Sequence, residues 1–220
     1  MRAMFFDLDG TLIDSLPGIE LSVDYALTQS KLPARQCELR PLIGPPIRRI
    51  FAQLVPDACE QQLSMLEGAF RTCYDSRGWR ETVLHENAAS TLRDLQRAGM
   101  RLFVVTNKPA LPTAQILAAL GLNDVFEDVV CPDSREPVFE SKHQMLESLI
   151  EMYNFARAEC RYIGDTYDDY VAALKAGIQV AIVQHDGAGL DQATRYPDGV
   201  VLRTLTELLE NGDSKIQKHS

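Results

Sequence analysis

The sequence predicts an α/β fold in which a parallel sheet forms the core and an all-helical domain is inserted after the first strand. Three observations favour this fold. Residues 3–6 form a short apolar run that ends in two acids close to the N-terminus. Residues 15–85 then carry apolar side chains at helical spacing and no strand signal. After residue 85, strand-like and helix-like segments alternate, which is typical of parallel strands joined by right-handed crossovers.

The helical insert divides into three parts. Residues 16–27 have apolar side chains at helical spacing and predict a first helix. Residues 41–56 contain several prolines and Gly44, and predict a loop with a short helix. Residues 57–79 predict another helix with one apolar face. An insert beside the acids of the first strand suggests a lid over a site, because ligands of open α/β sheets bind beyond the carboxyl ends of the strands.

The rest of the chain supplies the sheet and its helices. Residues 100–107 are a continuous apolar run and predict a strand buried on both faces. We assign residues 1–14 and 86–212 to the α/β core, residues 15–85 to the helical insert, and residues 213–220 to a frayed tail. The further strands are expected at 128–130, 160–165, 178–183 and 198–202, and the helices at 89–99, 111–121, 141–154, 168–177 and 205–210.

Composition excludes several classes of protein. The chain has 220 residues, of which 45% are hydrophobic and 24% charged, and no apolar run is long enough for a membrane span. The net charge of −9 disfavours an extended nucleic-acid partner, since that affinity rests on many Lys and Arg contacts with phosphate. The N-terminus has no secretory signal. Five widely spaced cysteines without CxxC pairing indicate free thiols and a cytoplasmic protein.

Polar side chains of useful kinds follow three of the predicted strands. A parallel sheet brings the carboxyl ends of its strands to one edge, however distant they are in sequence. We therefore expect four carboxylates, a threonine hydroxyl and at least one lysine to meet there. The first strand ends in Asp7 and Asp9, a later one in Thr106, Asn107 and Lys108, and a third in Asp165 with Asp169 in the next helix.

Four acids in one crevice repel one another and repel an anionic substrate. At about 5 Å and an effective dielectric near 20, each carboxylate costs a bound negative charge roughly 3 kcal/mol. Such a site needs a cation, and an all-oxygen ligand set without His or Cys points to Mg²⁺. A carboxylate nucleophile, a metal and a lysine suit phosphoryl transfer, in which positioning and charge neutralisation supply most of the catalysis.

Three segments resemble the motifs of a known family. "DLDGTLIDS", "VVTNKP" and "GDTYDDYVAALKAG" look like motifs I, II and IV of the haloacid dehalogenase (HAD) superfamily, in order and over nearly the whole chain. The insert after the first strand resembles the C1 helical cap of that superfamily. The resemblance implies a Rossmann-like parallel sheet core with an inserted cap. "GPP" and "TNKP" look most like the phosphoglycolate phosphatase-like branch.

The resemblance also implies roles for the acids. Asp7 would attack phosphorus and become an aspartyl-phosphate. Asp9 would protonate the leaving oxygen and then deprotonate the water that resolves the intermediate. Asp7 and Asp165 would bind Mg²⁺ through their carboxylates, Asp9 through its backbone carbonyl, and Asp169 directly or through water.

Other residues would hold the phosphoryl group. Thr106 would donate a hydrogen bond to it, helped by backbone N–H groups near Leu8 and Asn107. The lysine of motif III is harder to place, because the usual Lys-Pro is replaced by "SREPVFESKHQML". We assign this role to Lys142 at the start of a predicted helix, with Lys108 as its rival.

The cap residues would set specificity. In "IGPPIRRIF", Arg48 or Arg49 could meet a second anionic group on the substrate, such as the carboxylate of phosphoglycolate. Solvated helix charges are an equal alternative for these two arginines.

The sequence favours a Mg²⁺-dependent phosphatase that acts on a small phosphate monoester and has neither nucleic acid nor membrane as partner. A dehalogenase is disfavoured, because relatives with that chemistry lack the second aspartate. A β-phosphoglucomutase-like phosphomutase, a hydrolase for nucleotides or pyrophosphate, and a catalytically inactive regulatory binding protein stay as alternatives. The sequence leaves the oligomeric state open.

Overall fold

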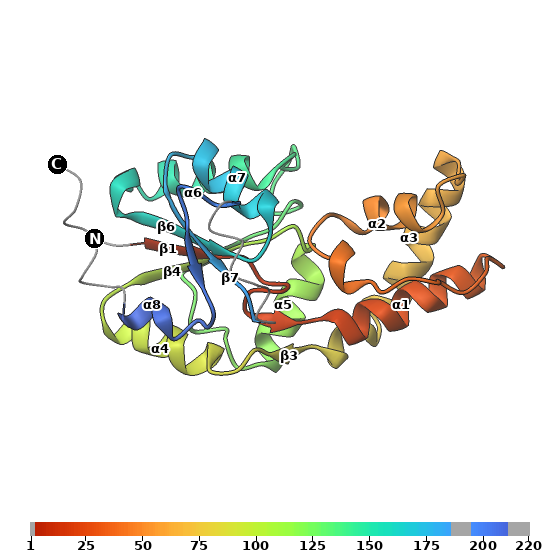
Figure 1. Ribbon diagram of the computed structural model, residues 1–220, viewed down its shortest axis with the longest axis horizontal. Helices are drawn as coiled ribbons and strands as arrows, with labels where there is room; N and C mark the ends of the chain where they lie inside the picture. Colours follow the sequence, from red (N-terminus) through yellow and green to blue (C-terminus); the bar gives the residue numbers. More distant parts are fainter. Residues whose placement is uncertain (1–2, 186–194, 211–220) are drawn as a thin grey trace.

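A six-stranded parallel sheet forms the core of the molecule, and a helical lobe projects from one end of it (Figure 1). The computed structural model describes residues 3–185 and 195–210. The strands are β1 (Ala3–Phe6), β2 (Ile13–Asp14), β3 (Val83–Leu84), β4 (Arg101–Val105), β5 (Asp128–Val130), β6 (Cys160–Gly164), β7 (Gln179–Val183) and β8 (Val200–Leu202). The helices are α1 (Leu16–Gln29), α2 (Ile47–Leu54), α3 (Glu60–Tyr74), α4 (Ala88–Arg97), α5 (Ala110–Ala119), α6 (Lys142–Met152), α7 (Tyr167–Lys175) and α8 (Glu207–Glu210).

The sheet has the strand order β5-β4-β1-β6-β7-β8, with every neighbouring pair parallel. The chain therefore builds the sheet outward from a central β1. Phe5 of this strand pairs with Phe103 on one side and with Tyr162 on the other. The predicted parallel α/β core is confirmed. Because β1 lies in the middle of the sheet and is covered on both faces, its side chains are apolar on both faces.

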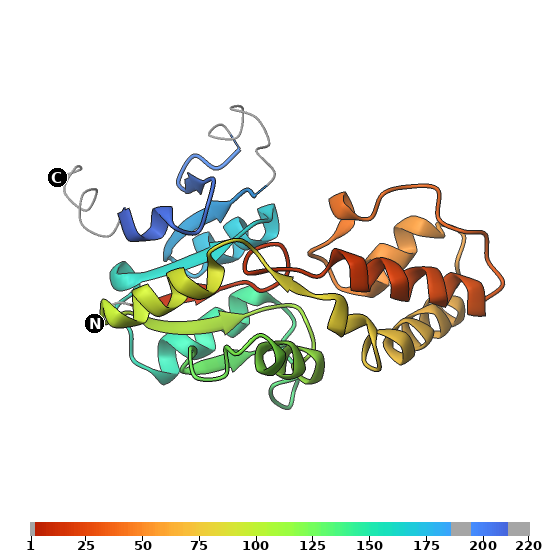
Figure 2. The same ribbon diagram turned by 90° about the horizontal axis from the view of Figure 1, so that it is seen from below.

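Helices cover both faces of the sheet, and Figures 1 and 2 show them as two outer layers. Alternate residues of each strand face opposite layers. Ala3 and Phe5 pack with the apolar sides of α6 and α7, whereas Met4 and Phe6 pack with those of α4, α5 and α8. Each face of the sheet is thus buried, and the carboxyl ends of the strands point toward the helical lobe (Figure 2).

The helical lobe has an apolar core of its own. Helices α1, α2 and α3 bury Val23, Phe51, Leu66 and Phe70 against one another. The ring of Phe70 stacks on that of Tyr74 with centroids 5.3 Å apart. The helical cap therefore has an apolar cluster separate from those on the two faces of the sheet.

The two connections between core and cap pair with each other. Strands β2 and β3 form a small antiparallel sheet in which Ile13 lies opposite Leu84. The prediction that residues 15–85 contain no strand is wrong at β3. Two residues are too few for a periodic apolar pattern, and the partner strand lies far away in the sequence.

The predicted tail at 213–220 lies outside the described residues. Within the described part of the chain, no helix combines the length and the apolar character that a membrane span requires.

Candidate active site

Three carboxylates meet at the carboxyl edge of the sheet. Asp7 follows β1, Asp165 follows β6, and Asp169 lies in the first turn of α7. One oxygen of each lies within 4.8 Å of the others. Asp7 and Asp169 are almost completely buried. The structure therefore brings together the three acids that the strand-end argument placed at one edge.

The turn after β1 holds Asp165 in place. The backbone carbonyl of Leu8 accepts hydrogen bonds from the N–H groups of Leu12 and Ile13, which folds the chain back on itself. Gly10 has a φ of 80°, and a Cβ built there would lie 2.2 Å from Oδ2 of Asp165. The hydroxyl of Thr11 donates to Oδ1 of Asp165 over 3.0 Å. A glycine is needed because the carboxylate occupies the space of a side chain and because φ is in the left-handed region.

Lys142 neutralises two of the three acids. It is the first residue of α6, whose N-cap Ser141 accepts a hydrogen bond from the backbone of Gln144. Its Nζ lies 2.9 Å from Oδ2 of Asp7 and 2.5 Å from Oδ1 of Asp169. The lysine side chain is only 5% exposed. Lys142 Nζ thus lies between Asp7 and Asp169 and forms an ion pair with each.

Asp169 orients its neighbours through both oxygens. Besides Lys142, the hydroxyl of Tyr162 donates to its Oδ1 over 3.1 Å. Its Oδ2 accepts from the backbone N–H groups of Asp165 and Thr166 and from the hydroxyl of Thr166. The bond from the Thr166 N–H, together with the Asp169 N–H that donates to the Thr166 hydroxyl, forms a capping box at the start of α7. Asp169 therefore holds both the lysine and the loop that carries Asp165.

The second lysine belongs to a different acid. Nζ of Lys108 lies 3.0 Å from Oδ1 of Asp9 and 2.9 Å from the hydroxyl of Tyr74 in the cap. The hydroxyl of Ser15 also donates to Oδ1 of Asp9, over 2.5 Å. Tyr74 and Ser15 are not among the site residues predicted from the sequence. Tyr74 had no signal beyond the apolar face of its helix, because its partner lies in the other domain.

Burial dominates the electrostatics of the cluster. It raises the pKa of Asp7 to about 6, although the Lys142 ammonium lowers it. Burial and the charge of Asp169 raise the pKa of Asp165 well above its ordinary value. Burial also disfavours the charge of Asp169, but Lys142 and the bonds from Thr166 outweigh it, so the pKa of this carboxyl is lowered. The single positive charge of Lys142 does not neutralise three carboxylates.

The residues of the cluster fit a divalent cation. Oδ1 of Asp7 is buried and has no hydrogen-bond partner among the described residues. Asp7 lies beside Asp165. Burial and the neighbouring carboxylates disfavour the ionised form of Asp165. Carboxylate oxygens without a nearby imidazole or thiolate in the cluster are the donors that Mg²⁺ prefers.

A cavity of about 470 Å³ opens between this cluster and the cap. Asp7, Asp9, Thr106 and Asn107 line it from the core, so the predicted phosphoryl-binding side chains face one space. The cap and the core are in contact where the cavity is lined by Asn107 and Gly44: the side-chain amide of Asn107 donates to the backbone carbonyl of Gly44 over 3.3 Å.

Arg48 and Arg49 are not among the residues that line this cavity. The guanidinium of Arg48 forms ion pairs with Glu60 and with Glu67 on the cap. The arginine that does line the cavity is Arg71, and it pairs with Glu67 over 2.8 Å. The structure thus does not bring the two predicted arginines to the phosphoryl site.

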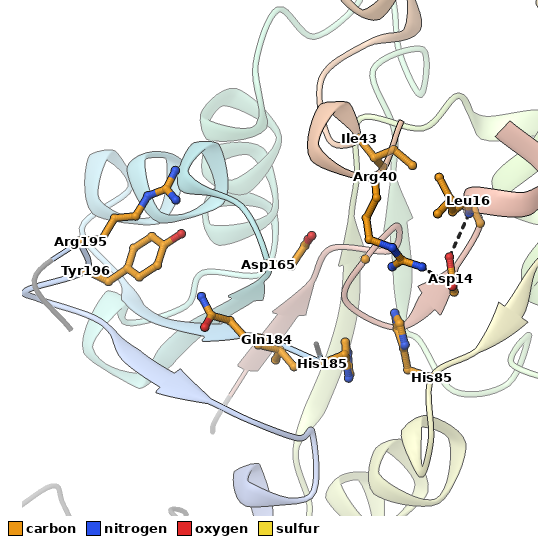
Figure 3. Close-up of a pocket in the computed structure, with 13 residues that line it drawn as sticks. Asp14, Leu16, Arg40, Ile43, His85, Asp165, Gln184, His185, Arg195 and Tyr196 are labelled. Atoms are coloured by element: carbon orange, nitrogen blue, oxygen red, sulfur yellow. Dashed lines mark hydrogen bonds and ion pairs between the residues drawn. The ribbon is translucent and has the colours of Figure 1, made fainter. Parts of the chain in front are cut away.

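A second cavity of about 260 Å³ borders Asp165 from the other side (Figure 3). The rings of His85 and His185 stack there with centroids 3.7 Å apart. Arg40 of the cap reaches Asp14 over 3.3 Å, as Figure 3 shows. Asp7 lines the larger cavity and Asp165 the smaller one, so the acidic cluster borders both.

Comparison with known proteins agrees with this architecture. The family model of haloacid dehalogenase-like hydrolases matches residues 4–183. A phosphoglycolate phosphatase from Haemophilus influenzae is 31% identical over 184 residues, which are 80% of this chain and 82% of that protein. One from Psychrobacter arcticus is 29% identical over 219 residues, covering 96% and 92% of the two chains.

Solved structures share the fold. A haloacid dehalogenase-like hydrolase from Streptococcus pneumoniae has a TM-score of 0.85 at 24% identity, covering 96% of this chain and 97% of that one. A protein described as a predicted phosphoglycolate phosphatase from Haemophilus somnus has a TM-score of 0.81 at 23% identity, covering 96% and 97%. Because the family model covers most of the chain, the chain belongs to the haloacid dehalogenase-like hydrolases.

Proposed function

We propose that this protein is a Mg²⁺-dependent phosphatase that hydrolyses a small phosphate monoester through an aspartyl-phosphate on Asp7. The observation that carries the proposal is the buried cluster at the end of β1, in which Lys142 binds Asp7 and Asp169 while Asp165 completes an oxygen-only set. Asp7, Asp165, the backbone carbonyl of Asp9 and, directly or through water, Asp169 would hold Mg²⁺. The ion would neutralise charge on the phosphoryl group and on the carboxylates around it.

The chain supplies the covalent chemistry itself. The carboxylate of Asp7 attacks phosphorus, and the bond between phosphorus and the ester oxygen breaks. Asp9 gives its proton to that leaving oxygen, so the alcohol departs neutral. Asp9 then removes a proton from water, which attacks phosphorus, releases inorganic phosphate and regenerates Asp7.

Neighbouring groups prepare these two acids for their roles. The Lys142 ammonium favours the ionised form of Asp7. It also reduces the repulsion between this carboxylate and the incoming phosphoryl group. The Lys108 ammonium and the Ser15 hydroxyl bind one oxygen of Asp9, which leaves its other oxygen to face the ester. Thr106 and the backbone N–H groups near Leu8 and Asn107 would bind the phosphoryl oxygens.

The names of the relatives and the branch resemblance make phosphoglycolate the first substrate to test. A β-phosphoglucomutase-like phosphomutase would keep the same two acids, and nucleotide or pyrophosphate hydrolysis would use the same cluster. The free state of the five cysteines supports a cytoplasmic setting.

The test is release of inorganic phosphate from a generic aryl phosphate with Mg²⁺. We expect turnover that EDTA abolishes and that Asp7→Asn abolishes without loss of the fold, as measured by circular dichroism. An inactive regulatory protein would give no turnover under any of these conditions. A mutase would convert a sugar phosphate into its isomer faster than it releases phosphate.

A further inference from the structure

The cavity above Asp7 is large for a two-carbon substrate. Its volume of about 470 Å³ lies in the range that drug-sized ligands occupy. Asp7 and Asp9 lie on its core side, so a bound phosphoryl group occupies one end. The remaining space extends into the cap and is available to the organic part of the ester.

The cap wall of this space is apolar. Ile19 of α1, Ile50 of α2 and Phe70 of α3 line it from the three cap helices and are each more than 90% buried. Ile47 and the two prolines before it line the same cavity. Leu111 at the start of α5 lines the same cavity and is 60% exposed, which places an apolar residue at its mouth.

Among the described residues, the cations that line the cavity are Arg71 and Lys108, and both are already paired with carboxylates. Arg71 pairs with Glu67 over 2.8 Å, and Lys108 pairs with Asp9 over 3.0 Å. Two further acids, Asp75 and Asp133, line the same cavity. A second anionic group on the substrate would therefore be desolvated beside surplus acid, which is unfavourable without a cation committed to it.

We propose that the substrate's organic part is an uncharged, largely apolar group of at least the size of one ring, which fills the cap side of the cavity. The proposal rests on the phosphatase function proposed above and narrows its substrate class. It favours aryl-alkyl phosphates over phosphoglycolate, because apolar area buried against the isoleucines and Phe70 contributes binding that a carboxylate cannot obtain there.

Three phosphate esters of primary alcohols test it. Ethyl phosphate is the reference, phosphoglycolate has a carboxylate in place of the methyl group, and 2-phenylethyl phosphate carries a phenyl ring on the second carbon. We expect kcat/KM for 2-phenylethyl phosphate to exceed that for ethyl phosphate by about 10- to 100-fold, with phosphoglycolate no better than ethyl phosphate. Equal rates for the ring and the ethyl ester, or a preference for phosphoglycolate over the ring, would overturn the substrate class while leaving the phosphatase intact.

A charge introduced into the cap wall provides a second test. We expect Ile47→Lys to lower kcat/KM for 2-phenylethyl phosphate at least 10-fold and to raise it for phosphoglycolate. Met65→Lys is the matched control, because Met65 is 60% exposed on α3 and does not line the cavity. This control should keep the wild-type ratio of the two substrates. Leu111→Lys at the mouth serves if thermal melting shows that the Ile47 variant is unfolded.

The outcomes separate the two proposals. An unchanged substrate ratio in the folded Ile47 or Leu111 variant means that the wall does not contact the organic group, and it overturns the substrate class alone. Absence of turnover for all three esters and for an aryl phosphate with Mg²⁺ removes the phosphatase function, and the substrate class falls with it.

Discussion

The two buried lysines allow a sharp test of the candidate site. Lys142→Met removes the ammonium that lies 2.9 Å from Asp7 and 2.5 Å from Asp169. Breaking a buried ion pair by removing one partner costs about 3–5 kcal/mol of folding stability, because the remaining charge is left uncompensated. Loss of one charge-stabilising donor at a reacting group costs about 10²–10³ in kcat. Lys108→Met removes a cation from Asp9 instead, so it leaves the nucleophile and its lysine in place.

We therefore expect Lys142→Met to lower kcat at saturating Mg²⁺ by about 10²–10³ for every substrate. Lys108→Met should act mainly on poor leaving groups, because it disturbs the position of the general acid. The assay is phosphate release from an alkyl and an aryl phosphate for both variants, with melting temperatures as the control for folding. If the Lys108 variant has the larger loss of kcat on the aryl phosphate, Lys142 is not the lysine that serves the phosphoryl group.

Three further expectations follow from the same geometry. Asp9→Asn should slow an alkyl ester by about 10²–10⁴ and an aryl ester much less, because aryl leaving groups need little protonation; equal losses in kcat would contradict the acid–base role. Gly10→Ala should weaken Mg²⁺ binding in calorimetry and cost about 1–2 kcal/mol of stability, since its Cβ would lie 2.2 Å from Oδ2 of Asp165 at a φ of 80°; an unchanged affinity would exclude this placement of Asp165. Mg²⁺ should raise the melting temperature more at pH 7.5 than at pH 5. Burial raises the folded-state pKa of Asp7 to about 6. The contribution of this carboxyl group to the stability of the metal-free protein is therefore present at low pH and is lost as the pH rises through 6. Above that pH, Mg²⁺ can offset the loss by binding the ionised form. Equal melting shifts at the two pH values would refute this linkage.

Much of the site could be predicted because its chemistry is attached to strand ends. Asp7 is distant in sequence from Asp165 and Asp169, but each belongs to a strand end or to the helix turn that follows one. Parallel pairing of β1 with β6 places these chain segments side by side. In the structure, one oxygen of each acid lies within 4.8 Å of the others. Strand-end position does not decide whether Lys142 or Lys108 lies beside Asp7, because both lysines follow strands that end at the same edge of the sheet.

The cap residues show where sequence reasoning stops. Arg48 and Arg49 were predicted substrate contacts because they follow a proline-rich loop in the insert. The structure directs Arg48 to Glu60 and Glu67, and it places Arg71 at the cavity instead. A helix of eight residues such as α2 has only a short apolar face, and the direction of its charged face depends on how the three cap helices pack.

The sequence by itself determined the α/β class, the helical insert and the kinds of side chain at the reaction centre, because local periodicity and strand-end position carry that information. Only the tertiary structure decided which lysine serves which acid, how Tyr74 of the cap meets Lys108 of the core, and which side chains form the wall of the cavity. These contacts depend on how the helical cap packs on the sheet domain, to which it is connected through the paired strands β2 and β3. Contacts between separate domains leave no periodic trace in either segment, because each helix satisfies its own apolar pattern within its own core.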